Sequence, residues 1–150
     1  PIITGARCLD LFAGSGALGL EAASRGAARV VLLERAAAVA RQLSRNAETL
    51  GEDRIEVIHI DALRWLERAG QPFDVVFVDP PFANGLLEPA CRSLDRHQWL
   101  ASGALVYLEW SARMPFPALP ANWELIRNKQ AGEACYGLAQ PGVEASPAIA

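Results

Sequence analysis

The sequence predicts an α/β protein built on an open, mostly parallel sheet, with helices on both faces and an antiparallel strand from a C-terminal hairpin. Three observations lead to this prediction. Five short apolar runs alternate with helical segments, as in sheets whose parallel strands are joined by crossover helices. The first run turns on closely spaced glycines into a helix. Two β-rich runs near the C-terminal end follow one another with no helix between them.

Each strand prediction rests on a short β-branched or apolar run, which is typical of parallel strands that are covered on both faces. These runs lie at residues 8–12, 29–34, 55–60, 73–78 and 104–109. The acidic residues that we single out at or just after the last position of a run are Glu34, Asp61 and Asp79. Because ligands of open α/β sheets bind outside the carboxyl ends of the strands, these acids mark the expected site.

The helix predictions rest on apolar residues that recur at three- or four-residue spacing. The segments are residues 17–24, residues 36–50, a short helix that carries Leu63, Leu66 and Arg68, and residues 86–97. Gly26 and Gly51 suit the ends of the first two helices, because glycine readily adopts the left-handed cap conformation. Pro89 is tolerable because it falls in the first turn of its helix.

The C-terminal part of the sequence predicts a hairpin. Its two strands are expected over residues 123–127 and 133–138, joined by a linker of about five residues that contains Gly132. Residues 141–150 are rich in Pro, Gly, Ala and Ser and are expected to form a flexible tail. Residues 1–140 are therefore expected to form one domain.

Composition agrees with one globular domain. The 150 residues are 51% hydrophobic and 21% charged, which excludes a disordered chain. No apolar run approaches the ~20 residues of a membrane span, so we expect no contact with a membrane. The net charge of −3 gives no overall basic footprint for a nucleic acid. The cysteines are far apart in apolar settings and are predicted to be buried, reduced thiols, as in a cytoplasmic protein: Cys8, Cys91 and Cys135.

The glycine turn after the first predicted strand indicates a nucleotide-like ligand. A strand that turns on glycines into a helix leaves unpaired backbone N–H groups over the carboxyl end of the strand. Gly14 and Gly16 have no Cβ, so we expect a ligand to press against the backbone there. The spacing to Gly19 also matches the dinucleotide fingerprint, which does not by itself identify the ligand.

Two of the strand-end acids suit a nucleoside. Glu34 follows Gly16 at about the ~20-residue spacing expected of a ribose-binding acid, and its carboxylate can accept hydrogen bonds from both ribose hydroxyls. The alternative is a solvated strand-end acid. Asp61 can accept from the exocyclic amine of an adenine, with the backbone of Ala62 serving a ring nitrogen. Asp61 also suits the N-cap of the following helix, and the two roles are compatible.

Asp79-Pro80-Pro81-Phe82 is the most specific pattern in the sequence. Consecutive prolines fix φ at two positions and favour extended backbone at the residue before each. We therefore expect a rigid ledge on which the Asp79 carboxylate and the Pro80 carbonyl point the same way. Two such acceptors suit an –NH2 group on a planar heterocycle, with Phe82 stacked on the base. An ordinary proline turn is the alternative.

With these motifs the sequence resembles the class I S-adenosylmethionine (SAM) methyltransferases, and most of all the bacterial guanine-N2 methyltransferases of small-subunit (16S) ribosomal RNA. Asp10 to Gly16 corresponds to the first motif of the class, and Asp79 to Phe82 to its amino-methylating tetrapeptide. The stretches that carry the resemblance are residues 10–22, 24–27, 79–82 and 128–132, with Tyr136. The resemblance covers about residues 7–140 and implies the Rossmann-like sheet of this class.

The resemblance also implies the site residues and the cofactor, SAM. Cofactor-binding residues are expected to be Asp10, Phe12, Ala13, Gly14, Ser15 and Gly16 for the methionine part, Glu34 for the ribose, and Asp61 with Ala62 for the adenine. Arg35, next to Glu34, is also expected to bind the cofactor. Catalytic residues are expected to be Asp79, Pro80, Pro81 and Phe82, which would take the target amino group and base. No metal site is expected.

The implied partner is 16S rRNA within a small-subunit assembly particle, bound by a cytoplasmic monomer. Arg127 and Lys129 are candidate phosphate contacts, although solvated charges explain them equally well. The family carries an N-terminal stretch with a basic hairpin and a segment that covers the cofactor. We expect this stretch to be absent from the sequence, which begins at Pro1.

Three other functions share parts of the pattern. A DNA adenine-N6 methyltransferase uses a similar tetrapeptide, but the sequence lacks a small target-recognition region after the fourth strand. An NAD-dependent oxidoreductase domain would explain the glycine spacing and Glu34, yet it leaves Asp79 and its prolines without a role. A module that binds SAM without transferring the methyl group is the third alternative.

Overall fold

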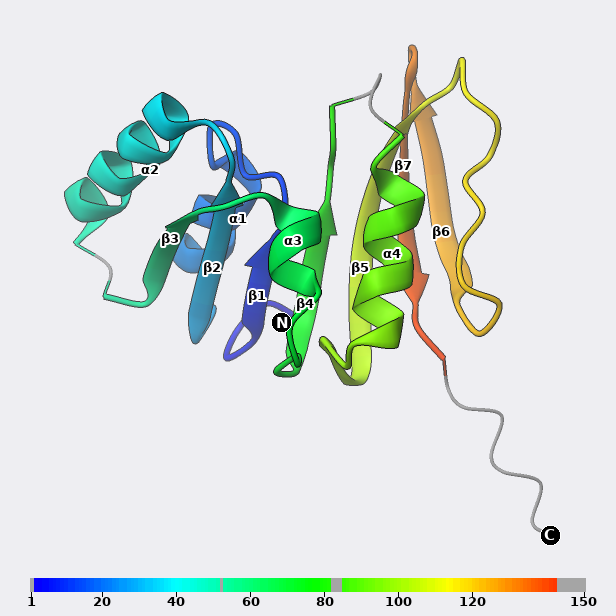
Figure 1. Cartoon of the computed structure of the whole chain (residues 1–150), viewed down its shortest axis with the longest axis horizontal. Helices are drawn as coiled ribbons and strands as arrows, with labels where there is room; N and C mark the ends of the chain where they lie inside the picture. Colours follow the sequence, from blue (N-terminus) through cyan, green and yellow to red (C-terminus); the bar gives the residue numbers. More distant parts are fainter. Residues whose placement is uncertain (1, 52, 82–84, 143–150) are drawn as a thin grey trace, which may run out of the picture.

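The computed structural model describes residues 2–51, 53–81 and 85–142, and these form a seven-stranded sheet in the order β3-β2-β1-β4-β5-β7-β6 (Figure 1). The strands are β1 (Arg7–Asp10), β2 (Arg29–Glu34), β3 (Ile55–His59), β4 (Phe73–Val78), β5 (Leu100–Ser111), β6 (Glu124–Ala131) and β7 (Ala134–Gln140). The helices are α1 (Ala17–Ser24), α2 (Ala37–Leu50), α3 (Ala62–Leu66) and α4 (Leu87–Arg96). The predicted fold class is confirmed.

The strand order reverses at β1, near the centre of the sheet. β1 pairs in parallel with β2 on one side and with β4 on the other, so that Leu9 lies opposite both Val31 and Val76. The chain after β1 therefore leaves toward α1 on one side, while the chain after β4 leaves toward α4 on the other. A switch point of this kind opens a crevice above the carboxyl ends of the strands.

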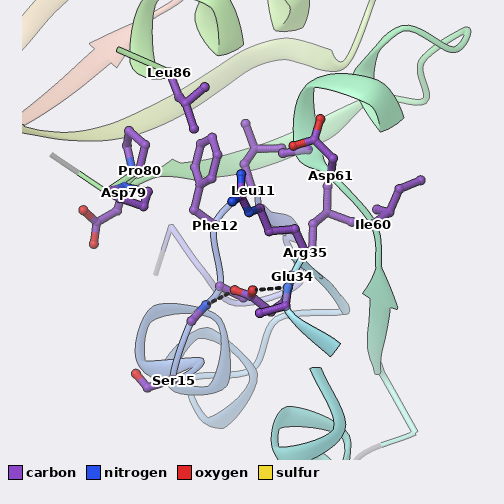
Figure 2. A pocket seen from close by; sticks show the side chains of 16 residues that line it. Leu11, Phe12, Ser15, Glu34, Arg35, Ile60, Asp61, Asp79, Pro80 and Leu86 are labelled. Carbon is purple, nitrogen blue, oxygen red and sulfur yellow. Dashed lines mark hydrogen bonds between the residues drawn. The ribbon is translucent and has the colours of Figure 1, made fainter. Parts of the chain in front are cut away.

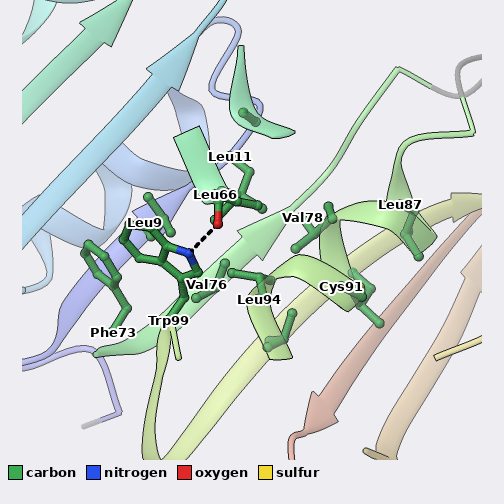
Figure 3. Packing of buried hydrophobic residues seen from close by; sticks show 14 of the residues in the cluster. Leu9, Leu11, Leu66, Phe73, Val76, Val78, Leu87, Cys91, Leu94 and Trp99 are labelled. Carbon is green, nitrogen blue, oxygen red and sulfur yellow. Dashed lines mark hydrogen bonds between the residues drawn. The ribbon is translucent and has the colours of Figure 1, made fainter. Parts of the chain in front are cut away.

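Two apolar clusters hold helices to the two faces of the sheet. On one face, the cluster under α3 and α4 contains Trp65 and Trp99, whose rings stack at 4.4 Å between centroids. The Trp99 indole Nε1–H donates to the Leu66 carbonyl at 2.9 Å (Figure 3). On the other face, α1 and α2 pack over β2 in a cluster that includes Val30 and Leu43. Helices on both faces were predicted, and this arrangement also covers β1 and β2 from both sides.

The hairpin strands are longer than the sequence predicted. Instead of a linker of about five residues, β6 and β7 meet at a two-residue turn formed by Gly132 and Glu133, with Gly132 at φ 61°. β6 lies at the edge of the sheet and most of its residues are exposed. Its polar end, residues 128–131, therefore lacks the apolar alternation that marks a half-buried strand. β7 lies between β5 and β6 and is antiparallel to both.

The first and fifth strands also differ from their predicted bounds. The run at residues 8–12 was predicted as strand, but β1 ends at Asp10 because Leu11 and Phe12 enter the glycine turn. β5 begins at Leu100 rather than at residue 104, since Leu100 pairs with Phe73 before a shift of register.

All three cysteines are free and buried, as predicted. In the part of the chain that the structure describes, no helix is long and apolar enough to cross a membrane. Phe82 and residues 143–150, which make up most of the predicted tail, lie outside the described residues.

Candidate active site

The three glycines of the turn after β1 have different roles. Gly14 adopts φ +54°, and no atom lies within 4 Å of the position that a Cβ would occupy. Gly16 adopts φ +85°, and a Cβ there would lie 2.5 Å from the Leu43 side chain of α2. A Cβ at Gly19 would overlap the Leu32 side chain of β2. A side chain at Gly16 or Gly19 would therefore meet packed neighbours within the chain, whereas the space at Gly14 is open. The contact of the Gly16 backbone with a ligand stays a prediction.

A cavity of about 530 Å³ opens above the carboxyl ends of the central strands. Figure 2 shows Asp79 and Pro80 at one end, Ile60 and Asp61 at the other, and Phe12 between them. The predicted site residues on its wall are Phe12, Ala13, Gly14, Ser15, Glu34, Arg35, Asp61, Ala62, Asp79, Pro80 and Pro81. Most of the predicted site is thus brought together in one cavity, while Asp10 and Gly16 are not on its wall and Phe82 lies outside the described residues.

The wall also contains small or apolar residues that the sequence analysis did not single out. They are Leu11, Leu33, Ala36, Ile60 and Leu86. Four of them are next to a predicted site residue in the chain, so including the immediate neighbours of each predicted residue would have found them. Leu86 had no such signal, because it reaches the wall from the segment that leads into α4.

Glu34 binds the backbone of the glycine turn. Its Oε1 accepts from the Gly14 N–H at 3.1 Å, and its Oε2 accepts from the Ala36 N–H at 2.7 Å (Figure 2). Glu34 is therefore more than a solvated strand-end acid, since it fixes the turn against the end of β2. A carboxylate has about four acceptor sites, so both oxygens retain capacity for further hydrogen bonds. The contact with ribose stays a prediction.

Asp61 is the N-cap of α3, which confirms one of the two roles that the sequence predicted for it. Its Oδ2 accepts from the Arg64 N–H at 3.2 Å. Asp61 also lies on the cavity wall, at the end opposite Asp79. The contact with adenine stays a prediction that this placement allows.

Asp10 lies behind the turn rather than on the cavity wall, and it is only 2% exposed. Its Oδ1 has no hydrogen-bond partner among the described residues. Burial is the main cause that raises the pKa of Asp10 to about 7. The negative charges of Asp79 and Glu34 raise this pKa further, whereas hydrogen bonds from the backbone N–H groups of Phe12 and Gly19 lower it. Asp10 is thus placed to organise the turn from below. Its direct contact with the methionine part of SAM stays a prediction.

Asp79, Pro80 and Pro81 follow β4 and lie on the cavity wall, with Asp79 half-buried and Pro80 buried. That the Asp79 carboxylate and the Pro80 carbonyl point the same way stays a prediction. The sequence analysis missed Glu109 of β5, which follows Leu108 and so lies beside Asp79, the residue after Val78. Burial raises the pKa of Glu109 to about 7, and the neighbouring Asp79 adds to the rise. Glu109 ends the fifth predicted strand, so the strand-end rule that selected the other acids would have found it.

The candidate phosphate contacts lie away from this cavity, on the edge strand β6. Arg127 pairs in register with Leu138, and Lys129 with Tyr136, and both basic side chains are exposed. Their contact with RNA stays a prediction. A search of residues 2–51, 53–81 and 85–142 finds no group of His, Cys, Asp and Glu that could hold a metal ion.

The strand order, the open glycine turn and the acceptor ledge together define a class I methyltransferase. Comparison with known proteins agrees with this class. The chain belongs to the family described as Conserved hypothetical protein 95, whose model matches residues 1–140.

Relatives in this family are named as ribosomal RNA methyltransferases. The chain is 48% identical over 140 residues to "Ribosomal RNA small subunit methyltransferase D" of Escherichia coli K12. The matched region covers 93% of this chain and 71% of the relative. It is 44% identical over 144 residues to the protein of the same name from Haemophilus influenzae, covering 93% and 74%. The structure superposes on that of the yhhF protein from Escherichia coli with a TM-score of 0.92 and 47% identity, covering 95% of this chain and 79% of that one. These relatives favour a methyltransferase over an NAD-dependent oxidoreductase.

Proposed function

We propose that this chain transfers a methyl group from SAM to the exocyclic N2 amino group of a guanine in small-subunit (16S) rRNA. One observation carries the proposal: the Asp79–Pro80 ledge stands at one end of a cavity whose other walls suit a nucleoside. The names of the relatives support small-subunit rRNA as the substrate. The proposal takes residues 1–140 as the catalytic domain, in line with the extent of the family match.

The residues of the cavity fit SAM. The open space over Gly14 lets a ligand approach the backbone at a point where any side chain would intervene. Glu34 is held by two backbone N–H groups, so its carboxylate is oriented before a ribose arrives. At the far end, Asp61 and the backbone of Ala62 offer polar contacts next to the apolar side chain of Ile60, as an adenine requires. When bound, SAM supplies an electrophilic methyl group on a sulfonium whose sulfur leaves as a neutral thioether.

The chain contributes mainly position. The Asp79 carboxylate and the Pro80 carbonyl would accept both hydrogens of the amino group, which turns the nitrogen lone pair out of the plane of the base. Well-oriented reactants gain ~7–11 kcal/mol over the same groups free in solution, so positioning supplies most of the barrier reduction in this proposal. After the nitrogen gains the methyl group, the Asp79 carboxylate is placed to take the proton that the nitrogen loses.

We further propose that a monomer acts on rRNA in a small-subunit assembly particle, in the cytoplasm where such particles form. Target bases in RNA are reached in loops or after they are turned out of a helix. Arg127 and Lys129, exposed on β6, would contribute phosphate contacts on the side of the sheet that carries β5 and β7.

The experiment that tests this function presents three substrates to the protein together with isotope-labelled SAM: free 16S rRNA, small-subunit particles and duplex DNA. We expect N2-methylguanosine in the RNA samples when the products are digested and their nucleosides analysed. Calorimetric titration with SAM and with NAD serves as the matched binding test, and we expect binding of SAM only. Label recovered as N6-methyladenine in DNA, or binding of NAD without SAM, would refute the proposed function.

A further inference from the structure

The pairing of β4 with β5 brings a second carboxyl group to the ledge. Val78 lies opposite Leu108 in the parallel register, so the next residues along the two strands, Asp79 and Glu109, are also neighbours. Glu109 in turn lies opposite Tyr136 of β7. Since paired residues of adjacent strands project from the same face, these side chains form a row across the sheet.

The side chains of this row lie close enough to the ledge to interact with it. The pKa of Glu109 responds to Asp79 on one side and to the Tyr107 hydroxyl on the other, which places Glu109 between these two groups. Two carboxyl groups form a hydrogen bond with each other only when one of them carries a proton, because a carboxylate has no donor. A hydrogen bond between Asp79 and Glu109 therefore requires the pair to hold one proton. The raised pKa of Glu109 supports this, and the raised pKa of Tyr107, caused first by burial and then by the charge of Glu109, keeps that hydroxyl a donor.

Glu109 also reaches a second cavity, on the other side of the prolines. This cavity has a volume of about 260 Å³, and Pro80, Pro81 and Leu86 line it as well as the first cavity. Glu109 lies on the wall of the second cavity, whereas Asp79 lies on the wall of the first. Glu109 thus connects the group that faces the proposed acceptor with a separate opening to water.

We propose that Glu109 is a positioning residue for Asp79 and the outlet for the proton released by amino methylation. In its protonated form, Glu109 donates a hydrogen bond to one oxygen of the Asp79 carboxylate and so fixes the other oxygen toward the acceptor amino group. This inference rests on the proposed function, because it assigns Asp79 to the amino group.

The proton count balances over one turnover. The nitrogen forms its bond to the methyl carbon as the carbon–sulfur bond breaks, and the nitrogen then gives one proton to Asp79. Glu109 gives one proton to water in the second cavity, and the proton on Asp79 moves to Glu109. The pair returns to one shared proton, and no oxidant or further reactant is required.

The pH response depends on all the ionisable groups that face Glu109. From the described residues these are Asp79 on the loop after β4, Tyr107 on β5 and Tyr136 on β7, with Lys129 of β6 opposite Tyr136. Glu88 of α4 lines the same cavity as Glu109. The buried Asp10 interacts with Asp79 in turn. Above about pH 7 the pair loses its shared proton. Asp79 then faces a second negative charge instead of a donor, so the rate of methyl transfer falls as the pH rises through this value.

The direct test is a carbon-13 NMR titration of the Glu109 carboxyl in the free protein, which needs neither cofactor nor RNA. We expect a midpoint near pH 7 in the wild type, and a midpoint lowered toward the ordinary value for glutamate in Asp79→Asn, which removes the second carboxyl group. An ordinary midpoint in the wild type, or a midpoint that Asp79→Asn leaves in place, overturns the inference.

Kinetics of three variants provide the second test. Glu109→Gln keeps a donor to Asp79 but does not titrate, so we expect its rate to stay constant across pH 6–8 while the wild-type rate falls. Glu109→Ala removes the donor, and we expect kcat to fall at least ~10-fold with little change in SAM affinity. Glu88→Gln, on the wall of the same cavity, retains an acceptor for the Ala118 N–H and should keep the wild-type pH profile.

The two proposals fail separately. If the titration shows the shared proton but the wild type methylates no RNA, the proposed function is wrong and the carboxyl pair stands. In the other case, the wild type methylates rRNA, and Glu109→Gln and Glu109→Ala have equally reduced rates with the wild-type pH profile. The role of Glu109 is then wrong and the proposed function stands.

Discussion

The buried carboxyl group of Asp10 predicts how the stability of the fold depends on pH. Folding raises the pKa of Asp10 from 3.8 to about 7, with burial as the main cause. Because the folded state holds this proton more tightly than the unfolded state, the resulting stabilisation is complete below the unfolded pKa. It is lost as the pH rises through the folded pKa. Integrated between pH 5 and pH 8, the loss amounts to about 2–3 kcal/mol.

Asp10→Asn removes this dependence, because an amide of nearly the same shape does not ionise. In urea unfolding, we expect the ionisation of Asp10 to lower the free energy of unfolding of the wild type by about 2–3 kcal/mol between pH 5 and pH 8. We expect Asp10→Asn to lack this contribution. Glu109, whose pKa is also raised, adds a smaller slope of the same sign in both proteins, since it is only half-buried and solvent screens part of its interactions.

The matched control is Asp53→Asn, which neutralises an exposed carboxylate. This variant should keep the wild-type difference between pH 5 and pH 8. If the free energy of unfolding falls by the same amount between pH 5 and pH 8 in Asp10→Asn and in the wild type, the ionisation of buried Asp10 does not cause the pH dependence.

Three further predictions concern the turn, the cavity and the core. Gly19→Ala should lower the free energy of unfolding by about 1–3 kcal/mol, because the added Cβ would overlap a side chain of β2. Gly14→Ala should lower it by only ~1 kcal/mol, because the added Cβ would meet open space and only the backbone conformation is unfavourable. Gly14→Ala should also weaken SAM binding. Equal costs in urea unfolding would contradict this difference. Glu34→Gln should weaken SAM binding about tenfold in calorimetry, since hydrogen bonds to a charged group are worth ~1.5–3 kcal/mol, and an unchanged Kd would speak against a ribose contact. Trp99→Phe should lose about 1 kcal/mol with the hydrogen bond to Leu66, and a variant as stable as the wild type would show that this bond contributes nothing.

The sequence predicted correctly those parts of the fold in which a residue pattern is compatible with only one kind of element. β2 and β4 are apolar runs buried on both faces, and their predicted bounds agree with the structure. The polar end of β6 was missed because an edge strand with exposed side chains needs no apolar alternation. Its pairing with β7 is stabilised by backbone hydrogen bonds, which leave little trace in the sequence.

The candidate site was predictable to the extent that it lies at strand ends. Glu34, Asp61 and Asp79 come together in the cavity because parallel strands present their carboxyl ends at one edge of the sheet. Spacing alone did not separate Gly14, which faces open space, from Gly16, which packs against α2, because that difference depends on a neighbour far along the chain. The contact between Asp79 and Glu109 likewise depends on the register of two strands, which single-strand patterns do not report.

The most direct test of the proposed function compares the wild type with Asp79→Ala on small-subunit particles. Both proteins are given isotope-labelled SAM, and the nucleosides of the recovered 16S rRNA are separated and analysed by mass spectrometry. We predict labelled N2-methylguanosine with the wild type and none with Asp79→Ala, whose affinity for SAM should remain within several-fold because Asp79 faces the acceptor. Labelled N2-methylguanosine at the wild-type rate with Asp79→Ala, or label in any other nucleoside, would contradict the role assigned to the ledge.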